Sequence, residues 1–579
     1  MVELAQFEVN GLPDGTPVQI QHEARGQADI YTLTVGQKGG PQIDLSRMIV
    51  SISADASEAA GRWYPQVRFP GVLQTWNNCI LSSYNNNAPI YSYYRQDDTN
   101  SLTAAIDDSI TAWSIRTGIA ERTRRLEFNA SPLSLKTDDW TTRFFIDRSN
   151  RPYFRSLRDA AEWWAETRND SLPIPEHAYD PVYSSWYTFQ RDVDADHLLH
   201  QCELAAELGC RTVFLDDGWA TPWQTDHFAH AGDWKPNEEK FPDLRGFVGK
   251  VHALGMKAVL WIAPTHSGFD SRSAKLYNNR SLRKIEGAKY SVLDLRYPDV
   301  RATLCRDMCR LVEDYGFDGL KIDFIDSING DTCEPDGERD FVSVSEALRN
   351  FLENLRRRLQ KINPEILIEY RQSYTGPDVL TTANIVRSGD CAQDFLTNRL
   401  NTINLRLHTN VAVHADMVQM IEGEDAEKSA LQITGILFST PQISVDLNKI
   451  SEDQRKMLRF WLGFMSEKRE LLQKSSFEPS RCYANFPSVT VRNASERLTA
   501  LYAENLLMLD EMAEQVYIVN AYDRKPVYLG CEQPSEAEYT ILNCMGEEIA
   551  RGTLTLGSTP TAAEIPFNGM MILKNRKGV

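Results

Sequence analysis

Residues 298–324 read PDVRATLCRDMCRLVEDYGFDGLKIDF and join a helical pattern to a short apolar run. Apolar side chains recur at helical spacing through Pro298–Tyr315, and Gly316 is a natural stop for a helix. The run Gly319–Phe324 has the length and composition of a strand buried in a parallel sheet. The stretch therefore predicts one helix that is followed by one buried strand.

The same alternation continues on both sides, from residue 176 to residue 475. The predicted strands are Val182–Phe189, Arg211–Leu215, Lys257–Ile262, Gly319–Phe324, Glu365–Tyr370, Ile385–Gly389, Val411–His414 and Gln442–Asp446. About eight strand–helix units of this length are typical of a TIM barrel, (β/α)8, rather than of an open sheet. No GxGxxG or GxxxxGK[ST] sequence follows these strands, which argues against dinucleotide and P-loop chemistry.

The flanking regions have a different texture. Residues 1–175 carry short β-like runs between Gly, Asn, Asp and Pro, and they predict an N-terminal β-sandwich. Residues 476–579 return to such runs and predict a small C-terminal antiparallel β domain. The α/β fold class thus comes from a central barrel, residues 176–475, between two β domains.

Composition narrows the classes of function. The formal net charge is −18, which disfavours nucleic acid and anionic membranes as partners. No secretory signal and no run of about 18 apolar residues is visible, so we expect a cytoplasmic protein without a membrane span. No metal-ligand spacing is diagnostic, and we expect neither a metal nor a cofactor. A homo-oligomer is compatible with the sequence.

Charged and aromatic side chains gather where the predicted strands end. They are Asp216, Asp217, Trp261, Lys321, Asp323, Arg371, Arg387 and Asp390. The carboxyl ends of barrel strands form the catalytic face of a TIM barrel. Carboxylates and cations bind sugar hydroxyls, aromatic rings pack on the apolar faces of sugars, and glycoside cleavage uses two carboxyl groups. The pattern predicts a glycosidase with Asp323 and Asp390 as the catalytic pair.

Each of these carboxylates has a structural alternative. A buried salt bridge with Lys321 would explain Asp323 equally, since both lie on one side of the strand. Asp216 and Asp217 could cap a loop or the next helix. Asp394 lies four residues after Asp390 and could be the acid in its place.

Longer motifs resemble glycoside hydrolase family 36, the α-galactosidase or melibiase family. They are LDDGW at 215–219, GDWKPNEEKFP at 232–242, HALGMK at 252–257 and LKID at 320–323. The resemblance runs from about Trp186 to Gln473, and it implies the three-domain layout and an oligosaccharide or glycoside substrate.

The resemblance also implies roles for single residues. In a retaining α-glycosidase of this family, Asp323 would be the nucleophile and Asp390 the acid/base. Hydroxyls of a galactose-like ring would be held by Asp216, Asp217 and Lys321. The sugar pocket would be shaped by Trp186, Trp219 and Trp261.

The chain departs from the family in two places. Glu369–Pro377 reads EYRQSYTGP where the family usually has Cys-x-x-Gly-x-Gly-Arg, so bulkier groups lie beside the sugar's C2 substituent. A family glutamate is replaced by Ala263. Arg371 could read an acidic or N-acyl substituent, or pack against Glu369. The alternatives to an α-galactosidase are a raffinose-synthase-like transglycosidase, an α-N-acetylgalactosaminidase or related exo-α-glycosidase, a catalytically dead sugar-binding protein and a metal-dependent barrel enzyme.

Overall fold

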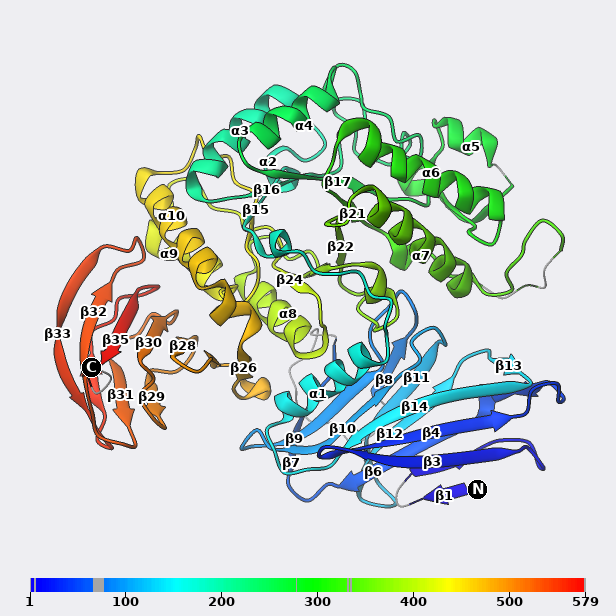
Figure 1. The fold of residues 1–579 in the computed structure, drawn as a ribbon, viewed down its shortest axis with the longest axis horizontal. Helices are drawn as coiled ribbons and strands as arrows, with labels where there is room; N and C mark the ends of the chain where they lie inside the picture. Colours follow the sequence, from blue (N-terminus) through cyan, green and yellow to red (C-terminus); the bar gives the residue numbers. More distant parts are fainter. Residues whose placement is uncertain are drawn as a thin grey trace.

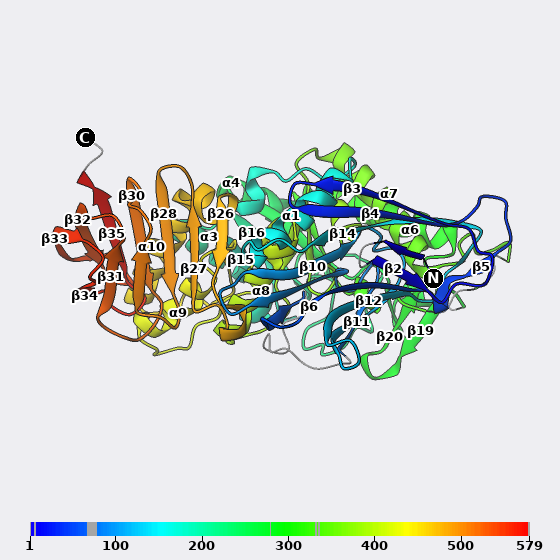
Figure 2. The same cartoon turned by 90° about the horizontal axis from the view of Figure 1, so that it is seen from below.

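The structure is a computed structural model that describes residues 2–4, 7–65, 78–277, 279–330, 333 and 336–576. It has three parts in chain order: a β-sandwich, a barrel and a second β-rich part. The two β-rich parts contact different sides of the barrel, so the molecule is elongated (Figures 1 and 2).

The central part is a parallel barrel, as the sequence predicts. Among the described residues its sheet has eight strands, in the order β24-β23-β22-β21-β17-β16-β15-β25. They span β15 (Val182–Ser184), β16 (Thr212–Leu215), β17 (Lys257–Ile262), β21 (Gly319–Ile322), β22 (Leu367–Arg371), β23 (Ile385–Arg387), β24 (Ala412–His414) and β25 (Gln442–Ile443). A parallel bridge between His414 and Thr440 nearly closes the ring between β24 and β25.

Helices surround this barrel (Figure 1). They include α3 (Ala195–Leu208), α4 (Leu244–Ala253), α6 (Pro298–Tyr315), α7 (Val344–Ile362), α8 (Phe395–His408), α9 (Ala426–Gly435) and α10 (Glu452–Glu467). Helix α6 begins with Pro298 at its first turn and ends at Gly316, which adopts the left-handed conformation (φ 81°) that glycine tolerates. The helix and strand predicted from residues 298–324 are therefore both present.

Two connections differ from the predicted pattern. The predicted strand Val182–Phe189 is wrong in its second half, because β15 ends at Ser184 and a short helix, α2 (Trp186–Phe189), follows. A short apolar run has no periodicity that separates a strand from a buried helical turn. The connection from β22 to β23 contains a 3-10 turn, η5 (Val379–Thr382), in place of an α-helix.

The amino-terminal part is a sandwich of two six-stranded antiparallel sheets. One sheet contains β1 (Val2–Leu4), β2 (Phe7–Asn10), β6 (Ile49–Asp55), β12 (Arg125–Pro132), β11 (Trp113–Ala120) and β8 (Asn78–Ser82). The other contains β3 (Val18–Arg25), β4 (Ala28–Gly36), β14 (Asp139–Asp147), β10 (Asn100–Ile106), β9 (Ile90–Arg95) and β7 (Ala59–Trp63). Helix α1 (Tyr153–Glu166) leads from the sandwich to the barrel and packs on α8.

The carboxy-terminal part is mainly antiparallel. Its larger sheet contains β26 (Ser476–Pro479), β27 (Ser488–Arg492), β28 (Glu496–Leu501), β30 (Gln515–Asn520), β35 (Met570–Asn575), β32 (Ser535–Leu542) and β33 (Glu548–Leu556). A smaller sheet contains β29 (Leu506–Leu509), β31 (Val527–Cys531) and β34 (Thr561–Ala563). The pairs β28–β30 and β29–β31 are parallel.

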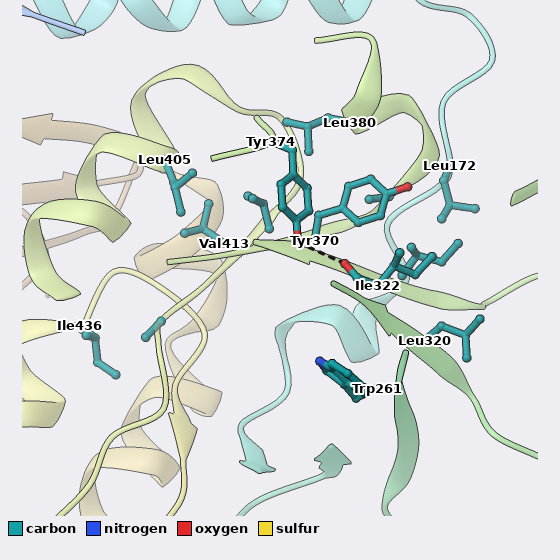
Figure 3. Packing of buried hydrophobic residues seen from close by; sticks show 14 of the residues in the cluster. Leu172, Trp261, Leu320, Ile322, Tyr370, Tyr374, Leu380, Leu405, Val413 and Ile436 are labelled. Carbon is teal, nitrogen blue, oxygen red and sulfur yellow. Dashed lines mark hydrogen bonds between the residues drawn. The ribbon is translucent and has the colours of Figure 1, made fainter. Parts of the chain in front are cut away.

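Buried apolar side chains fill the barrel and continue beneath the strand ends (Figure 3). Leu320 and Ile322 of β21 are fully buried, and so is Tyr370 of β22. The hydroxyl of Tyr374 donates to the carbonyl oxygen of Ile322 at 3.3 Å and ties the loop after β22 to the end of β21. Close packing of this kind fixes the backbone that carries the strand-end side chains.

Candidate active site

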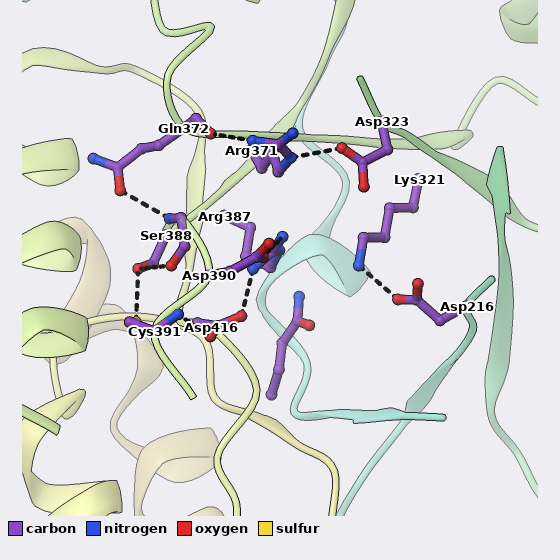
Figure 4. Close-up of polar contacts among 12 residues, drawn as sticks. Asp216, Lys321, Asp323, Arg371, Gln372, Arg387, Ser388, Asp390, Cys391 and Asp416 are labelled. Atoms are coloured by element: carbon purple, nitrogen blue, oxygen red, sulfur yellow. Dashed lines mark hydrogen bonds and ion pairs between the residues drawn. The ribbon is translucent and has the colours of Figure 1, made fainter. Parts of the chain in front are cut away.

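Charged side chains from several strands converge at the carboxyl end of the barrel (Figure 4). Asp216 follows β16, Asp323 follows β21, and Arg371 and Arg387 are the last residues of β22 and β23. Asp390 lies three residues beyond β23. The structure thus brings together the residues that strand-end reasoning selected.

Asp323 lies between three strand ends. Its Oδ1 accepts hydrogen bonds from Arg371 Nε at 2.6 Å and from the hydroxyl of Tyr374 at 3.3 Å. Its Oδ2 accepts one bond, from Trp261 Nε1 at 3.1 Å. The side chain is nearly buried, at 11% exposure. The two oxygens therefore differ: Oδ1 is occupied by several donors, and Oδ2 is the freer of the two.

Asp323 is held in its ionised form. Burial alone would raise the pKa of this carboxyl, but the positive charges of Arg371 and Lys321 hold the pKa well below its usual range. The alternative explanation, a direct ion pair of Asp323 with Lys321, does not hold: Asp323 pairs with Arg371, and Lys321 pairs with Asp216. A carboxylate that is charged and nearly dry is suited to nucleophilic attack.

This arrangement predicts a shift in pH dependence for Arg371→Met. The substitution removes the nearest positive charge, so the pKa of Asp323 rises and the acid limb of kcat/KM moves to higher pH. Profiles measured with a neutral aryl glycoside check this. Arg371→Lys is the matched control, because it keeps the charge and should leave the limb close to that of the unaltered protein. An acid limb at the same pH in both variants would contradict the electrostatic role.

Asp216 and Asp217 each have a cationic partner. Lys321 Nζ lies 2.6 Å from Asp216 Oδ2, and both side chains are buried. Arg191, from the loop before α3, donates through Nε to Asp217 Oδ2 at 2.6 Å. Burial raises the pKa of Asp217 against the opposing charge of Arg191. The two carboxylates are thus fixed side by side at the end of β16, and neither caps a helix.

Asp390 and Asp394 are separated by their environments. Asp394 accepts from the backbone N–H of Thr397 at 3.0 Å and is the N-cap of α8. The side chain of Asp390 is 69% exposed, and its Oδ1 lies 2.9 Å from Arg387 Nη2. The charge of Arg387 lowers the pKa of Asp390. Since the carboxylate of Asp394 is engaged in capping, Asp390 is the better placed acid/base candidate.

A buried polar network stands behind Arg387. Its guanidinium pairs with Asp416 and lies 3.8 Å from Glu369 Oε1. Glu369 Oε2 is 3.1 Å from His414 Nδ1 and accepts from Gln442 Nε2 at 2.6 Å. Arg371, the other candidate partner of Glu369, turns to Asp323 instead. The barrel interior therefore holds Arg387 rigidly under the loop that carries Asp390.

The predicted tryptophans occupy different depths. Trp261 is 4% exposed and touches Asp323 through its indole nitrogen. Trp219 is 1% exposed and donates to the backbone oxygen of Trp261 at 3.0 Å, so it supports Trp261 from behind. Trp186 is partly buried at the start of α2. Their contacts with a sugar stay predictions.

The amino-terminal sandwich reaches into this site. Asn85 Nδ2 donates to the carbonyl oxygens of Ile325 and Ile328, at 2.7 and 2.8 Å, in the loop that follows Asp323. The backbone N–H of Asn87 donates to the carbonyl oxygen of Ser373 at 2.6 Å, in the loop after β22. The turn between β8 and β9, residues 83–89, is thereby bonded to the loops behind both Asp323 and Arg371.

Sequence reasoning missed two members of the site. Asp416 follows β24 by two residues, so the strand-end rule could have found it. Arg191 lies in a loop, and no pattern in the sequence pairs it with Asp217. Within the described ranges no group of three His, Cys, Asp or Glu side chains could hold a metal ion. No described helix is long and apolar enough to span a bilayer.

Comparisons with known proteins indicate the family of this chain. The melibiase family model matches residues 176–475. The chain is 27% identical over 185 residues to an α-galactosidase of Escherichia coli and 27% identical over 172 residues to an A type blood α-D-galactosamine galactosaminidase of Flavonifractor plautii. These alignments cover 31% and 26% of this chain, and they span only 25% and 15% of the relatives' lengths.

The fold is similar to that of the GH36 α-galactosidase AgaA of Geobacillus stearothermophilus, solved in complex with 1-deoxygalactonojirimycin. The TM-score is 0.72 at 17% identity, and the alignment covers 97% of this chain and 81% of that one. Because the melibiase match covers just over half of the 579 residues, the chain belongs to the melibiase family, glycoside hydrolase family 36.

Proposed function

We propose that this protein is a retaining exo-α-glycosidase that hydrolyses terminal α-galactoside-like residues. The observation that carries the proposal is Asp323, a nearly dry carboxylate kept ionised by Arg371 and Lys321 at the end of a barrel strand. The relative from Escherichia coli and the structural neighbour AgaA are named α-galactosidases, and Asp390 supplies a second carboxyl group on a nearby loop. Two carboxyl groups are what glycoside cleavage requires.

In the first step Asp323 Oδ2 attacks the anomeric carbon, and the bond from that carbon to the glycosidic oxygen breaks. Asp390 donates its proton to the departing oxygen, and the sugar stays bound to Asp323 as an ester. Trp261 Nε1 donates to the attacking oxygen and orients it. Arg371 keeps Oδ1 neutralised while Oδ2 forms the bond.

In the second step Asp390, now a carboxylate, accepts a proton from water. The water oxygen attacks the anomeric carbon from the face that the leaving group vacated, and the ester bond to Asp323 breaks. Two inversions at one carbon return the α configuration. Arg387, 2.9 Å from Asp390, favours the ionised form that this second step needs.

The charges of the site favour a neutral glycone. Each nearby cation already has a carboxylate partner: Arg191 with Asp217, Lys321 with Asp216, Arg371 with Asp323 and Arg387 with Asp390. Asp326, Asp416 and Glu369 add further carboxylates around Arg371 and Arg387. Free cations to receive an acidic sugar are thus lacking among these residues, and its carboxylate would meet excess negative charge.

We therefore expect an aryl α-galactoside to be cleaved with a kcat/KM at least about tenfold above that of the matching α-galacturonide, since tenfold corresponds to about 1.4 kcal/mol of repulsion between like charges. Initial rates on a panel of aryl α-glycosides measure this, with the glucoside as a neutral control. A preferred galacturonide would contradict the charge argument. NMR of the first-formed sugar tests the mechanism, because β-galactose as first product would overturn retention.

The same panel separates the remaining alternatives. Including the N-acetylgalactosaminide tests whether the side chains of Arg371–Tyr374 accept a larger substituent at C2. Adding sucrose as acceptor and analysing the products distinguishes a transglycosidase from a hydrolase. Free galactose as the dominant product in the presence of acceptor supports hydrolysis.

A further inference from the structure

Asp416 bonds to the loop that carries Asp390, although it lies at the end of another strand. Its side chain is fully buried. Its Oδ1 accepts from Arg387, and its Oδ2 accepts from the backbone N–H of Cys391 at 2.7 Å (Figure 4). These two partners lie on either side of Asp390 in the sequence. One carboxylate therefore holds the loop at both ends.

Asp416 is itself held firmly. Asn398 of α8 bonds its backbone in both directions, since Nδ2 donates to the carbonyl oxygen at 3.0 Å and Oδ1 accepts from the N–H at 3.0 Å. The hydroxyl of Tyr187, from α2, donates to Oδ2 at 3.1 Å. A buried group with this many partners has little freedom to move.

Asp390 lacks comparable support of its own. Its side chain is 69% exposed, and among the residues that the structure describes its ion-pair partner is Arg387. Its direction thus depends on where Arg387 and the 387–391 backbone are held. From these contacts we infer that Asp416 is a positioning residue that aims the acid/base Asp390 at the glycosidic oxygen. This inference rests on the proposed function and assigns the residue that makes its proton transfer effective.

Asp416 also shares the charge of Arg387. The groups around Asp390 are Arg387 of β23, Lys321 of β21, Arg371 of β22, Tyr187 of α2 and Asp416 after β24. Burial, and then the negative charge of Asp390, raise the pKa of Asp416, so the two carboxylates repel each other. Without the negative charge of Asp416, the carboxylate of Asp390 is repelled less and is still attracted by Arg387. The pKa of Asp390 therefore falls further.

The test compares Asp416→Asn with the unaltered protein on two aryl α-galactosides, one with a poor phenol leaving group and one with 2,4-dinitrophenol. The second substrate departs without a proton and does not need Asp390 in the first step. We expect kcat/KM to fall about 10²-fold on the phenyl substrate, the lower end of what general acid catalysis contributes, and less than about tenfold on the dinitrophenyl substrate. The basic limb of kcat/KM on the phenyl substrate should move to lower pH.

Asp394→Asn is the matched control, because it alters a carboxylate near the same loop that bonds, within the described part of the chain, to Thr397 at the N-cap of α8. This variant should have the kcat/KM of the unaltered protein on both substrates and the same pH profile. Equal losses of Asp416→Asn on both substrates, with an unmoved basic limb, would overturn the positioning role. Asp416→Asn keeps the shape of the side chain, and thermal unfolding verifies that it folds. If it does not fold, Asp416→Glu, which keeps the charge but displaces the carboxylate, replaces it for the comparison of the two substrates. Unaltered protein that cleaves neither substrate would overturn the proposed function itself, and this inference with it.

Discussion

Asp323→Asn is expected to abolish turnover, with kcat reduced by on the order of 10⁴-fold or more, as when other catalytic nucleophiles are removed. The amide of Asn cannot form the glycosyl ester, and it carries no charge to stabilise the positive character that develops at the anomeric carbon. The change is isosteric but removes a buried charge, so Arg371 keeps Asp326, 3.5 Å away, as an ion-pair partner.

Initial rates on an aryl α-galactoside measure this loss, and circular dichroism with thermal unfolding verifies the fold. A second measurement locates the covalent bond: 5-fluoro-α-galactosyl fluoride should label the unaltered protein on the peptide that contains Asp323. Turnover within about tenfold of the unaltered protein, where tenfold is about 1.4 kcal/mol, would remove Asp323 from the mechanism.

Asp390→Asn is expected to produce the second largest effect, and a selective one. General acid catalysis contributes about 10²- to 10⁴-fold, so kcat/KM on a phenyl α-galactoside should fall by that factor. The loss on a dinitrophenyl α-galactoside should be far smaller, because that leaving group needs no proton. The basic limb of the pH profile, which reports the acid, should disappear.

Azide gives an independent readout for Asp390→Asn. Without a general base the ester on Asp323 reacts slowly with water, and azide, which needs no base, should restore turnover and yield α-galactosyl azide. Asp394→Asn is the control: Asn and Asp are about equal as N-caps, so neither its activity nor its stability should change. If Asp394→Asn lost activity selectively on the phenyl substrate and Asp390→Asn did not, the two assignments would be exchanged.

The barrel and its catalytic face could be predicted from sequence because both depend on local patterns. Helical spacing through Pro298–Tyr315 and a glycine stop located α6, and the apolar run after it located β21. Once the strands are placed, Asp323 becomes a candidate catalytic residue, because the catalytic groups of such barrels lie at the carboxyl ends of strands. The segment Val182–Phe189 shows the limit, because the four residues after Ser185 form a helical turn that no periodic pattern indicates.

The partners of the charged groups could not be predicted, because they depend on which strand ends meet in space. Lys321 and Asp323 alternate to one side of β21, yet the amine pairs with Asp216 from β16. Arg371 donates to Asp323 of the neighbouring strand end and not to Glu369 of its own strand. Arg191 reaches Asp217 from a loop. Each cation pairs with the carboxylate that lies nearest to it in space. No local pattern in a single sequence encodes these distances.

Through the turn at residues 83–89, the sandwich and the barrel both support the catalytic centre. Asn85 and Asn87 belong to the sandwich, but their hydrogen bonds end on the loops behind Asp323 and Arg371. A barrel transplanted without its sandwich would leave the carbonyl oxygens of Ile325 and Ile328 without this amide donor. We therefore expect recombination between relatives to preserve the site only when the sandwich and the barrel are exchanged together. A domain boundary predicted from sequence separates two parts that support one site.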